Sequence, residues 1–158
     1  MIQDRPRCIL FLDFDGVTHP DPHEAEELFT LLPLIEDVLR GFEACKIVIS
    51  SSWREVHPLD ELREFFAPDM RPRVIGVTPD HRFLRGTYLR QLECEAWLRK
   101  KQVWLPQNQR AGTPWVAIDD CPYMFRPYCG NLLAIQPKKG FTRKDAVRLE
   151  AMLRERLP

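Results

Sequence analysis

Two carboxylates, one residue apart, follow the first apolar run of this chain. Cys8 to Leu12 are five apolar or near-apolar residues, and Asp13, Asp15 and Gly16 come directly after them. Alternate side chains of a strand point to the same face, so the two carboxylates would lie together at a sheet edge. Such a pair is tolerated where a cation lies between the two groups or where one of them keeps its proton. The alternative is a strand that exits into a polar turn, with Gly16 supplying the bend.

Apolar runs alternate along the chain with helical patterns. The predicted strands are residues 9–13, 46–49, 73–77, 115–118 and 132–135, and the predicted helices are residues 31–42, 59–66, 87–100 and a last one capped by Thr142. This alternation predicts one α/β domain over residues 1–158, a three-layer Rossmann-like parallel sheet with helices on both faces. In the helix at 87–100, four apolar residues at helical spacing predict the packing face: Leu89, Leu92, Ala96 and Trp97.

Polar side chains end three of the predicted strands. Asp13 and Asp15 follow the first strand, Ser50 follows the second, and Asp119 and Asp120 follow the fourth. Ligands of parallel α/β sheets bind where the carboxyl ends of the strands open into a crevice, so these groups should meet at one edge. A cluster of carboxylate oxygens there is suited to Mg²⁺, which shares its remaining positions with water and substrate phosphate.

The order of these segments resembles a known family. DFDGV, then IVISS, then a basic residue opening a helix, then VAIDD is similar to the haloacid dehalogenase (HAD) superfamily of aspartate-dependent phosphohydrolases, over residues 8 to about 136. ISSSWR and the later R-x-x-E before WL resemble a small capless HAD group associated with RNA-repair proteins. VAIDDC is also similar to the phosphatase half of phage polynucleotide kinase/phosphatase. The resemblance implies a HAD-like fold and a Mg²⁺-dependent phosphatase.

The resemblance also implies roles for individual residues. Asp13 matches the nucleophile that attacks phosphorus and forms an aspartyl-phosphate, and Asp15 matches the general acid that protonates the leaving oxygen and then activates water. Ser50 matches the hydroxyl that hydrogen-bonds a phosphoryl oxygen, with Ser51 as the alternative. Covalent capture followed by hydrolysis divides one difficult displacement into two easier steps.

A metal site follows from the same resemblance. The carboxylate of Asp13, the backbone carbonyl of Asp15 and the carboxylate of Asp120 match the Mg²⁺ ligands, with Asp119 as a second acidic partner. In phosphoryl transfer, catalysis is mostly alignment of the reacting groups and neutralisation of phosphoryl charge, to which a divalent cation contributes.

The third motif departs from the family, because a lysine is usual there and residues 71–98 contain none. Arg90, at the start of the helix and three residues before Glu93, is the first candidate for the phosphate-facing cation, and Arg85 is the second. An arginine can supply the charge with a bidentate fork, although it does not replace lysine like for like. The alternative is that Arg90 pairs with Glu93 or Glu95 on an exposed helix face.

Other polar and aromatic residues carry weaker expectations. Arg54, just after Trp53, is either a phosphate contact at the mouth of the crevice or, more in keeping with its position, a solvated side chain beside a structural tryptophan. Lys138 and Lys139 are expected in an exposed turn. Three tryptophans are expected to be core residues rather than base-stacking platforms: Trp97, Trp104 and Trp115.

His19, Asp21 and His23 are metal-ligand types in a short loop, where they alternate with prolines. Structural and catalytic zinc sites need three or four protein ligands in a suitable geometry. Without further ligands nearby, we expect no zinc site in this loop.

Composition limits the classes of partner. Formal net charge is zero and hydrophobic content is 44%, so no overall field attracts nucleic acid and no apolar run is long enough for a membrane span. Residues 13–43 carry nine acidic side chains against Arg40, whereas residues 71–110 carry nine basic ones against three acidic ones. A basic middle folded over an acidic metal site would suit a phosphorylated substrate. Five cysteines without a CxxC pair, and no leader segment, predict a reducing, cytoplasmic location.

Spacing limits the substrate. Only 34 residues separate Asp15 from Ser50, and 39 separate Ser50 from Arg90, so neither insertion can form a cap domain, meaning an inserted domain that covers the site. In the HAD family an uncapped crevice usually goes with bulky substrates, so a nucleotide or nucleic-acid end is the expected phosphomonoester. The alternatives are a phosphorylatable receiver-like signalling domain and a non-enzymatic nucleic-acid-binding module.

Overall fold

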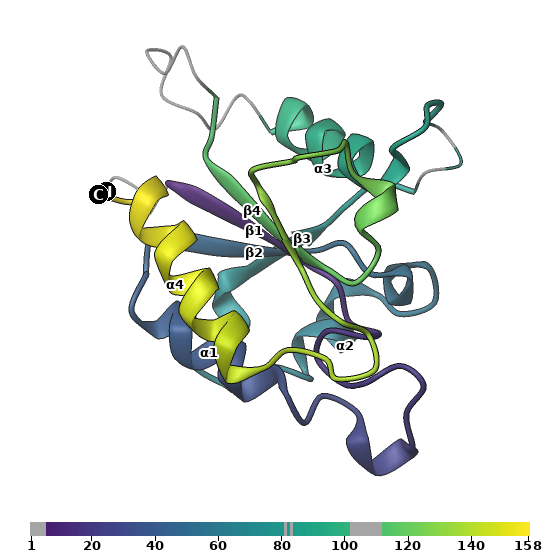
Figure 1. Cartoon of the computed structure of the whole chain (residues 1–158), viewed down its shortest axis with the longest axis vertical. Coiled ribbons are helices and arrows are strands. Elements are labelled where there is room, and N and C mark those ends of the chain that lie inside the picture. Colours follow the sequence, from purple (N-terminus) through teal and green to yellow (C-terminus); the bar gives the residue numbers. More distant parts are fainter. Residues whose placement is uncertain (1–5, 81, 83, 102–111) are drawn as a thin grey trace.

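The computed structural model describes residues 6–80, 82, 84–101 and 112–158. Its centre is a five-stranded parallel sheet in the order β3-β2-β1-β4-β5, so β1 is the middle strand (Figure 1). The strands are β1 (Cys8–Leu12), β2 (Cys45–Ile49), β3 (Val74–Val77), β4 (Trp115–Asp119) and β5 (Leu132–Ala134). Each lies within one residue of its predicted bounds, because short apolar runs bounded by polar residues are a local signal.

Helices cover both faces of the sheet, as Figure 1 shows. One face carries α1 (Leu32–Arg40), α2 (Leu59–Arg63) and α4 (Arg143–Arg156), and the other carries α3 (Leu89–Lys100) with the short 3₁₀ helix η6 (Pro122–Met124). The larger core lies on the first face, where Leu10, Ile47 and Ile118 pack against Ile35 and Leu149. The predicted three-layer α/β fold is therefore confirmed.

Three helices differ at their ends from the prediction, and the first is α1, which covers Leu32–Arg40 rather than residues 31–42. Helix α2 stops at Arg63 rather than at residue 66, although Phe66 is still buried in the core, and α3 begins at Leu89 rather than at residue 87. The cap of α4 is as predicted, because the Thr142 hydroxyl accepts the Asp145 N–H and the Asp145 carboxylate accepts the Thr142 N–H.

The predicted packing face of α3 is wrong in part. Its buried residues are Gln91, Glu93, Cys94 and Trp97, whereas Leu89, Leu92 and Ala96 are only half-buried. The buried polar residues have partners: Glu93 pairs with Arg54, and the Gln91 side-chain oxygen accepts the Arg126 N–H. Apolar spacing alone could not reveal this face, because it depends on groups from distant segments.

Smaller expectations about tryptophans and lysines have mixed outcomes. A second core, on the α3 face of the sheet, contains the buried Trp97. Trp115 packs half-buried against this second core, so both tryptophans are structural as expected. Trp104 lies outside the described residues. Lys138 and Lys139 lie in an exposed turn, as predicted.

The sheet brings the functional strand ends together. Leu12 is in register with Ile49 of β2 and with Ile118 of β4, so the residues that follow β1, β2 and β4 emerge side by side. Between β1 and β2 the chain forms only η1 (Ala25–Glu27) and α1, which leaves no cap domain in that insertion. Across the described ranges, no helix combines the length and apolar character required to cross a membrane.

Candidate active site

Asp13 is the central carboxylate of the site. It follows β1 directly, its backbone N–H donates to the carbonyl of Ile118 at 3.1 Å, and the residue is only 6% exposed. Burial raises the pKa of Asp13 well above its ordinary value, the neighbouring charge of Asp119 raises it further, and the Arg90 guanidinium opposes both. Asp120 adds its own charge and a hydrogen bond. Three carboxylates are therefore crowded at this sheet edge.

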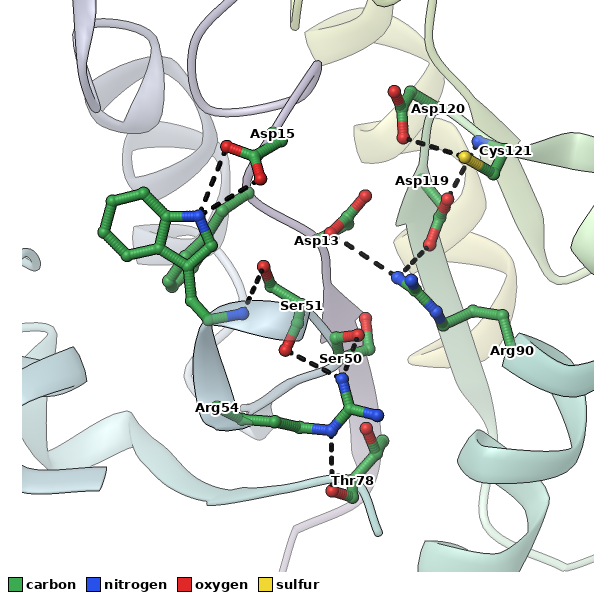
Figure 2. A network of polar contacts seen from close by, with 12 residues as sticks. Asp13, Asp15, Ser50, Ser51, Arg54, Thr78, Arg90, Asp119, Asp120 and Cys121 are labelled. Atoms are coloured by element: carbon green, nitrogen blue, oxygen red, sulfur yellow. Dashed lines mark hydrogen bonds and ion pairs between the residues drawn. The ribbon is translucent and has the colours of Figure 1, made fainter. Parts of the chain in front are cut away.

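Arg90 is the cation that faces these carboxylates. It lies in the first turn of α3, and its Nη1 is 2.8 Å from Asp119 Oδ2 and 3.4 Å from Asp13 Oδ1 (Figure 2). Its side chain is 12% exposed, so the alternative of an exposed helix-face pair is wrong, although its Nε does lie 3.5 Å from Glu93. Arg85 is exposed and lines a cavity with Arg126 instead.

Asp119 fixes the position of Arg90. Its Oδ2 accepts the Arg90 hydrogen bond and its Oδ1 accepts the backbone N–H of Cys121 at 2.8 Å. Burial raises the pKa of Asp119 to about 6, and the charge of Arg90 is the main opposing influence. Both oxygens are thus engaged by donors. A ligand role for Asp119 stays a prediction, and the geometry favours its role as the anchor of Arg90.

Asp120 lies against the turn that carries the first two aspartates. Gly16 has a φ of 73°, and a Cβ on it would overlap the Asp120 carboxylate. The thiol of Cys121 lies 3.4 Å from the Asp120 Oδ1. Because only a glycine permits this approach, the local sequence DFDG is what lets Asp120 reach the Asp13 side of the crevice.

These oxygens fit a hard divalent cation. The carboxylates of Asp13 and Asp120 crowd each other, which is one cause of the raised pKa of Asp13, and a cation between them would relieve that repulsion. Carboxylate and carbonyl oxygens are the ligands that Mg²⁺ takes, and the backbone carbonyl of Asp15 is the third predicted ligand. The donor set is therefore suitable for Mg²⁺, and its occupancy by this ion stays a prediction.

Ser50 and Ser51 follow β2 and are both buried at 1% exposure. Ser50 continues the sheet, since its N–H donates to the carbonyl of Leu12, whereas the Ser51 hydroxyl accepts the Trp53 N–H and caps η2 (Ser52–Glu55). The Ser51 oxygen thus already has a structural task, which favours Ser50 as the phosphate-facing hydroxyl. That assignment remains a prediction.

Both expectations for Arg54 are wrong. Its side chain is 4% exposed, and its guanidinium donates to the carbonyls of Ser50, Ser51 and Thr78 and pairs with Glu93 at 3.1 Å. It is neither solvated nor at the mouth of the crevice. A local sequence pattern could not show this, because Glu93 lies in α3, which follows β3 and is distant from Arg54 in the sequence.

Two residues that sequence reasoning did not assign to the site hold Asp15. His19 Nε2 lies 2.8 Å from Asp15 Oδ1, and the Trp53 indole N–H lies 3.2 Å from each carboxylate oxygen. The Asp15 side chain is 39% exposed, so it is the most accessible of the carboxylates in ion pairs at this site. The four-residue separation of His19 from Asp15 was the available signal, whereas nothing local pointed to Trp53.

The histidine loop does bring possible metal ligands together. Ligand atoms of Asp15, His19 and His23 lie within 4.8 Å of one another, and Asp21 is not part of that group. The Nε2 of His19 is already hydrogen-bonded to Asp15, and the Nδ1 accepts the Phe29 N–H. Because both ring nitrogens have partners, the geometry supports a hydrogen-bonded network rather than a zinc centre.

Comparison with known proteins supports the predicted resemblance to the HAD superfamily. The model of the family described as the HAD domain in Swiss Army Knife RNA repair proteins matches residues 9–146, from β1 into α4. No curated protein and no solved structure gave a match. HAD membership indicates an activity of the phosphohydrolase type. Since the match covers most of the sequence and every strand, this chain belongs to the family of HAD domains in Swiss Army Knife RNA repair proteins.

Proposed function

We propose that this protein is a Mg²⁺-dependent phosphomonoester hydrolase that forms an aspartyl-phosphate on Asp13. The observation that carries the proposal is the buried Asp13 carboxylate at the centre of the sheet edge, with the Arg90 guanidinium 3.4 Å away and fixed by Asp119. A nucleophile paired with a fixed cation at the carboxyl end of a parallel sheet is what phosphoryl transfer requires.

In the first half-reaction, an oxygen of Asp13 attacks phosphorus. The bond between phosphorus and the ester oxygen breaks, and the leaving oxygen takes a proton from Asp15. Arg90 and the Ser50 hydroxyl would hold the phosphoryl oxygens while charge shifts among them. Positioned proton transfer of this kind contributes roughly a hundred- to ten-thousand-fold to the rate.

In the second half-reaction, Asp15 removes a proton from a water molecule as it attacks phosphorus. The bond between phosphorus and Asp13 breaks, inorganic phosphate leaves, and both carboxylates return to their starting states. Asp13, Asp120 and the carbonyl of Asp15 would hold Mg²⁺, whose chemistry when bound is neutralisation of phosphoryl charge.

The substrate that we propose is a nucleotide or the phosphorylated end of a nucleic acid. The β1–β2 insertion carries no cap domain, so a bulky phosphoester can approach. The family description refers to RNA repair, and basic side chains of Arg85 and Arg126 line a cavity beside α3. These three observations support a polyanionic substrate over a small sugar phosphate.

The proposal is tested by hydrolysis of p-nitrophenyl phosphate with MgCl₂. Asp13→Asn should abolish turnover and EDTA should do the same, whereas Asp60→Asn should leave activity unchanged, because the Asp60 side chain is 92% exposed and pairs with Arg63 on the surface of α2. Acid-quenched protein should carry phosphate in the wild type and none in Asp13→Asn.

Three results would contradict the proposal. One is inactivity over nucleotides, 3′- and 5′-phosphorylated oligonucleotides, phosphopeptides and sugar phosphates. Another is a long-lived phospho-aspartate without turnover, which would indicate a receiver-like domain. The third is salt-sensitive oligonucleotide binding that survives loss of Asp13 and Asp120 in a chain without activity, which would indicate a binding module.

A further inference from the structure

The Asp15 carboxylate is held by donors from two separate segments. His19 Nε2 lies 2.8 Å from its Oδ1, and the indole N–H of Trp53 is shared between Oδ1 and Oδ2 at 3.2 Å each. Figure 2 shows the indole contacts as dashed lines beside Asp15, on the opposite side of Asp13 from Arg90. Asp15 is thus oriented independently of the Arg90–Asp119 pair.

The hydrogen bonds of His19 determine which ring nitrogen carries the proton. The Phe29 N–H donates to His19 Nδ1 at 3.3 Å, and a backbone N–H can only donate, so Nδ1 is an acceptor; the Thr18 hydroxyl, 3.1 Å from the same nitrogen, can donate to it as well. The ring proton is therefore on Nε2, where it points at Asp15 Oδ1. His19 itself is fully buried, which keeps this donor away from water.

Aromatic packing holds both donors in place. The ring centroid of Trp53 lies 5.2 Å from that of Phe29 and 5.9 Å from that of Phe14. Phe29 stacks on Phe65 with a centroid distance of 4.1 Å. Phe29 has a φ of 58°, a left-handed backbone that is rare for a bulky residue. Such a backbone persists where the surroundings fix it, and here it aims the Phe29 N–H at His19.

We propose that His19 and Trp53 are positioning residues for proton transfer, and that Oδ2 of Asp15 is the oxygen that gives and takes the proton. Within the described part of the chain, Oδ1 accepts two hydrogen bonds, whereas Oδ2 accepts only the shared one from Trp53. A proton is carried best on the oxygen with fewer donors, and the donors stabilise the carboxylate that forms as the proton leaves. The inference rests on the proposed function and deepens it.

The test compares two leaving groups in Trp53→Phe, which removes the indole N–H and keeps an aromatic ring. The alkoxide of adenosine 5′-monophosphate needs a proton to leave, whereas p-nitrophenolate does not. We expect kcat/KM to fall at least about tenfold with the nucleotide and by less than about threefold with p-nitrophenyl phosphate. The ratio kcat/KM is used because it covers only the steps up to departure of the leaving group.

A double-mutant cycle shows whether Trp53 acts through Asp15. In an Asp15→Asn background, adding Trp53→Phe should cost no further activity toward the nucleotide. His19→Leu should show the leaving-group pattern of Trp53→Phe, and His19→Gln, which restores an amide donor, should recover part of the loss. Trp115→Phe is the matched control, because Trp115 packs on Phe11 far from Asp15 in the second core.

Equal losses with both substrates, or none with either, would overturn the positioning role while the proposed function stands. Additive losses in the double mutant would do the same. A wild-type chain inactive on both substrates and on the wider panel of phosphoesters named above would remove the proposed function and the inference together. Thermal unfolding of each variant separates loss of folding from loss of activity, and Trp53→Phe decides the matter if the His19 variants fail to fold.

Discussion

At the level of residues, two adjacent aspartates have different tasks. Asp119 is almost fully buried and gives both oxygens to donors, one from Arg90 and one from the Cys121 backbone. Asp120 turns toward the Gly16 turn and the Asp13 carboxylate. Asp119 is the last residue of β4 and Asp120 begins the bend that follows it, so one carboxylate can anchor Arg90 while its neighbour approaches Asp13.

Gly16 is where this arrangement is most easily disturbed. In Gly16→Ala, the new methyl group would overlap the Asp120 carboxylate and strain a left-handed backbone. We expect a loss of about 1–2 kcal/mol in the free energy of unfolding from the backbone alone. We also expect activity to require more Mg²⁺, because Asp120 must move. Chemical denaturation and a Mg²⁺ titration of the rate measure the two effects.

Gly112→Ala is the matched control for this variant. Gly112 has nearly the same φ, 72°, but a Cβ there would meet nothing within 4 Å. It should therefore show the backbone cost without the shift in Mg²⁺ requirement. An unchanged Mg²⁺ titration in Gly16→Ala would show that Asp120 does not hold the ion.

At the level of elements, the buried Arg54 connects the ends of β2 and β3 to α3. Arg54, in η2 after β2, donates to carbonyls of residues that follow β2 and β3 and pairs with Glu93 of α3, and both side chains are 4% exposed or less. Glu93 also lies 3.5 Å from Arg90. The position of α3, and with it the position of Arg90, thus depends on η2.

Arg54→Met should consequently destabilise the fold. Removing one member of a buried pair leaves the other charge uncompensated, at a typical cost of about 3–5 kcal/mol. We expect the lower part of that range, because Arg90 remains close to Glu93. Urea denaturation measures the loss. Arg154→Met, which breaks an exposed pair with Glu150, should change stability little, and an equally small loss for Arg54→Met would contradict this account.

Sequence patterns predicted the strands and the residues at their ends, because both are local signals. Asp13, Ser50 and Asp120 could be located without coordinates for that reason. The contacts of Asp15 and Arg54 could not, because their partners Trp53 and Glu93 reach them only through tertiary packing. The packing face of α3 was predicted wrongly for the same reason: burial of a charged residue such as Glu93 is unfavourable unless a distant partner compensates it.

At the level of the whole molecule, a basic cavity lies on one side of the candidate site, beside α3. Arg85 and Arg126 line a cavity of about 300 Å³ beside the start of α3, where Arg90 also lies. Arg126 follows η6, which itself follows Asp120. The two segments that line the cavity, the start of α3 and the segment after η6, are thus each close in sequence to a residue of the site. Its basic rim could hold phosphates that neighbour the reacting one along a nucleic-acid chain.

The paired variant Arg85→Gln/Arg126→Gln tests whether the protein binds phosphates of its substrate other than the reacting one. We expect kcat/KM for a phosphorylated oligonucleotide to fall, and its salt dependence to weaken by about one unit of log–log slope per lost phosphate contact. Activity toward p-nitrophenyl phosphate should change little, since that substrate has no second phosphate. Arg40→Gln/Arg154→Gln removes the same charge near the opposite end of the sheet, where α1 and α4 end, and should affect neither substrate. If both paired variants lower oligonucleotide turnover equally, total charge rather than the Arg85–Arg126 cavity attracts the substrate. If neither does, the open edge accepts a phosphoester without contacts to its neighbours, and a mononucleotide becomes the better substrate assignment.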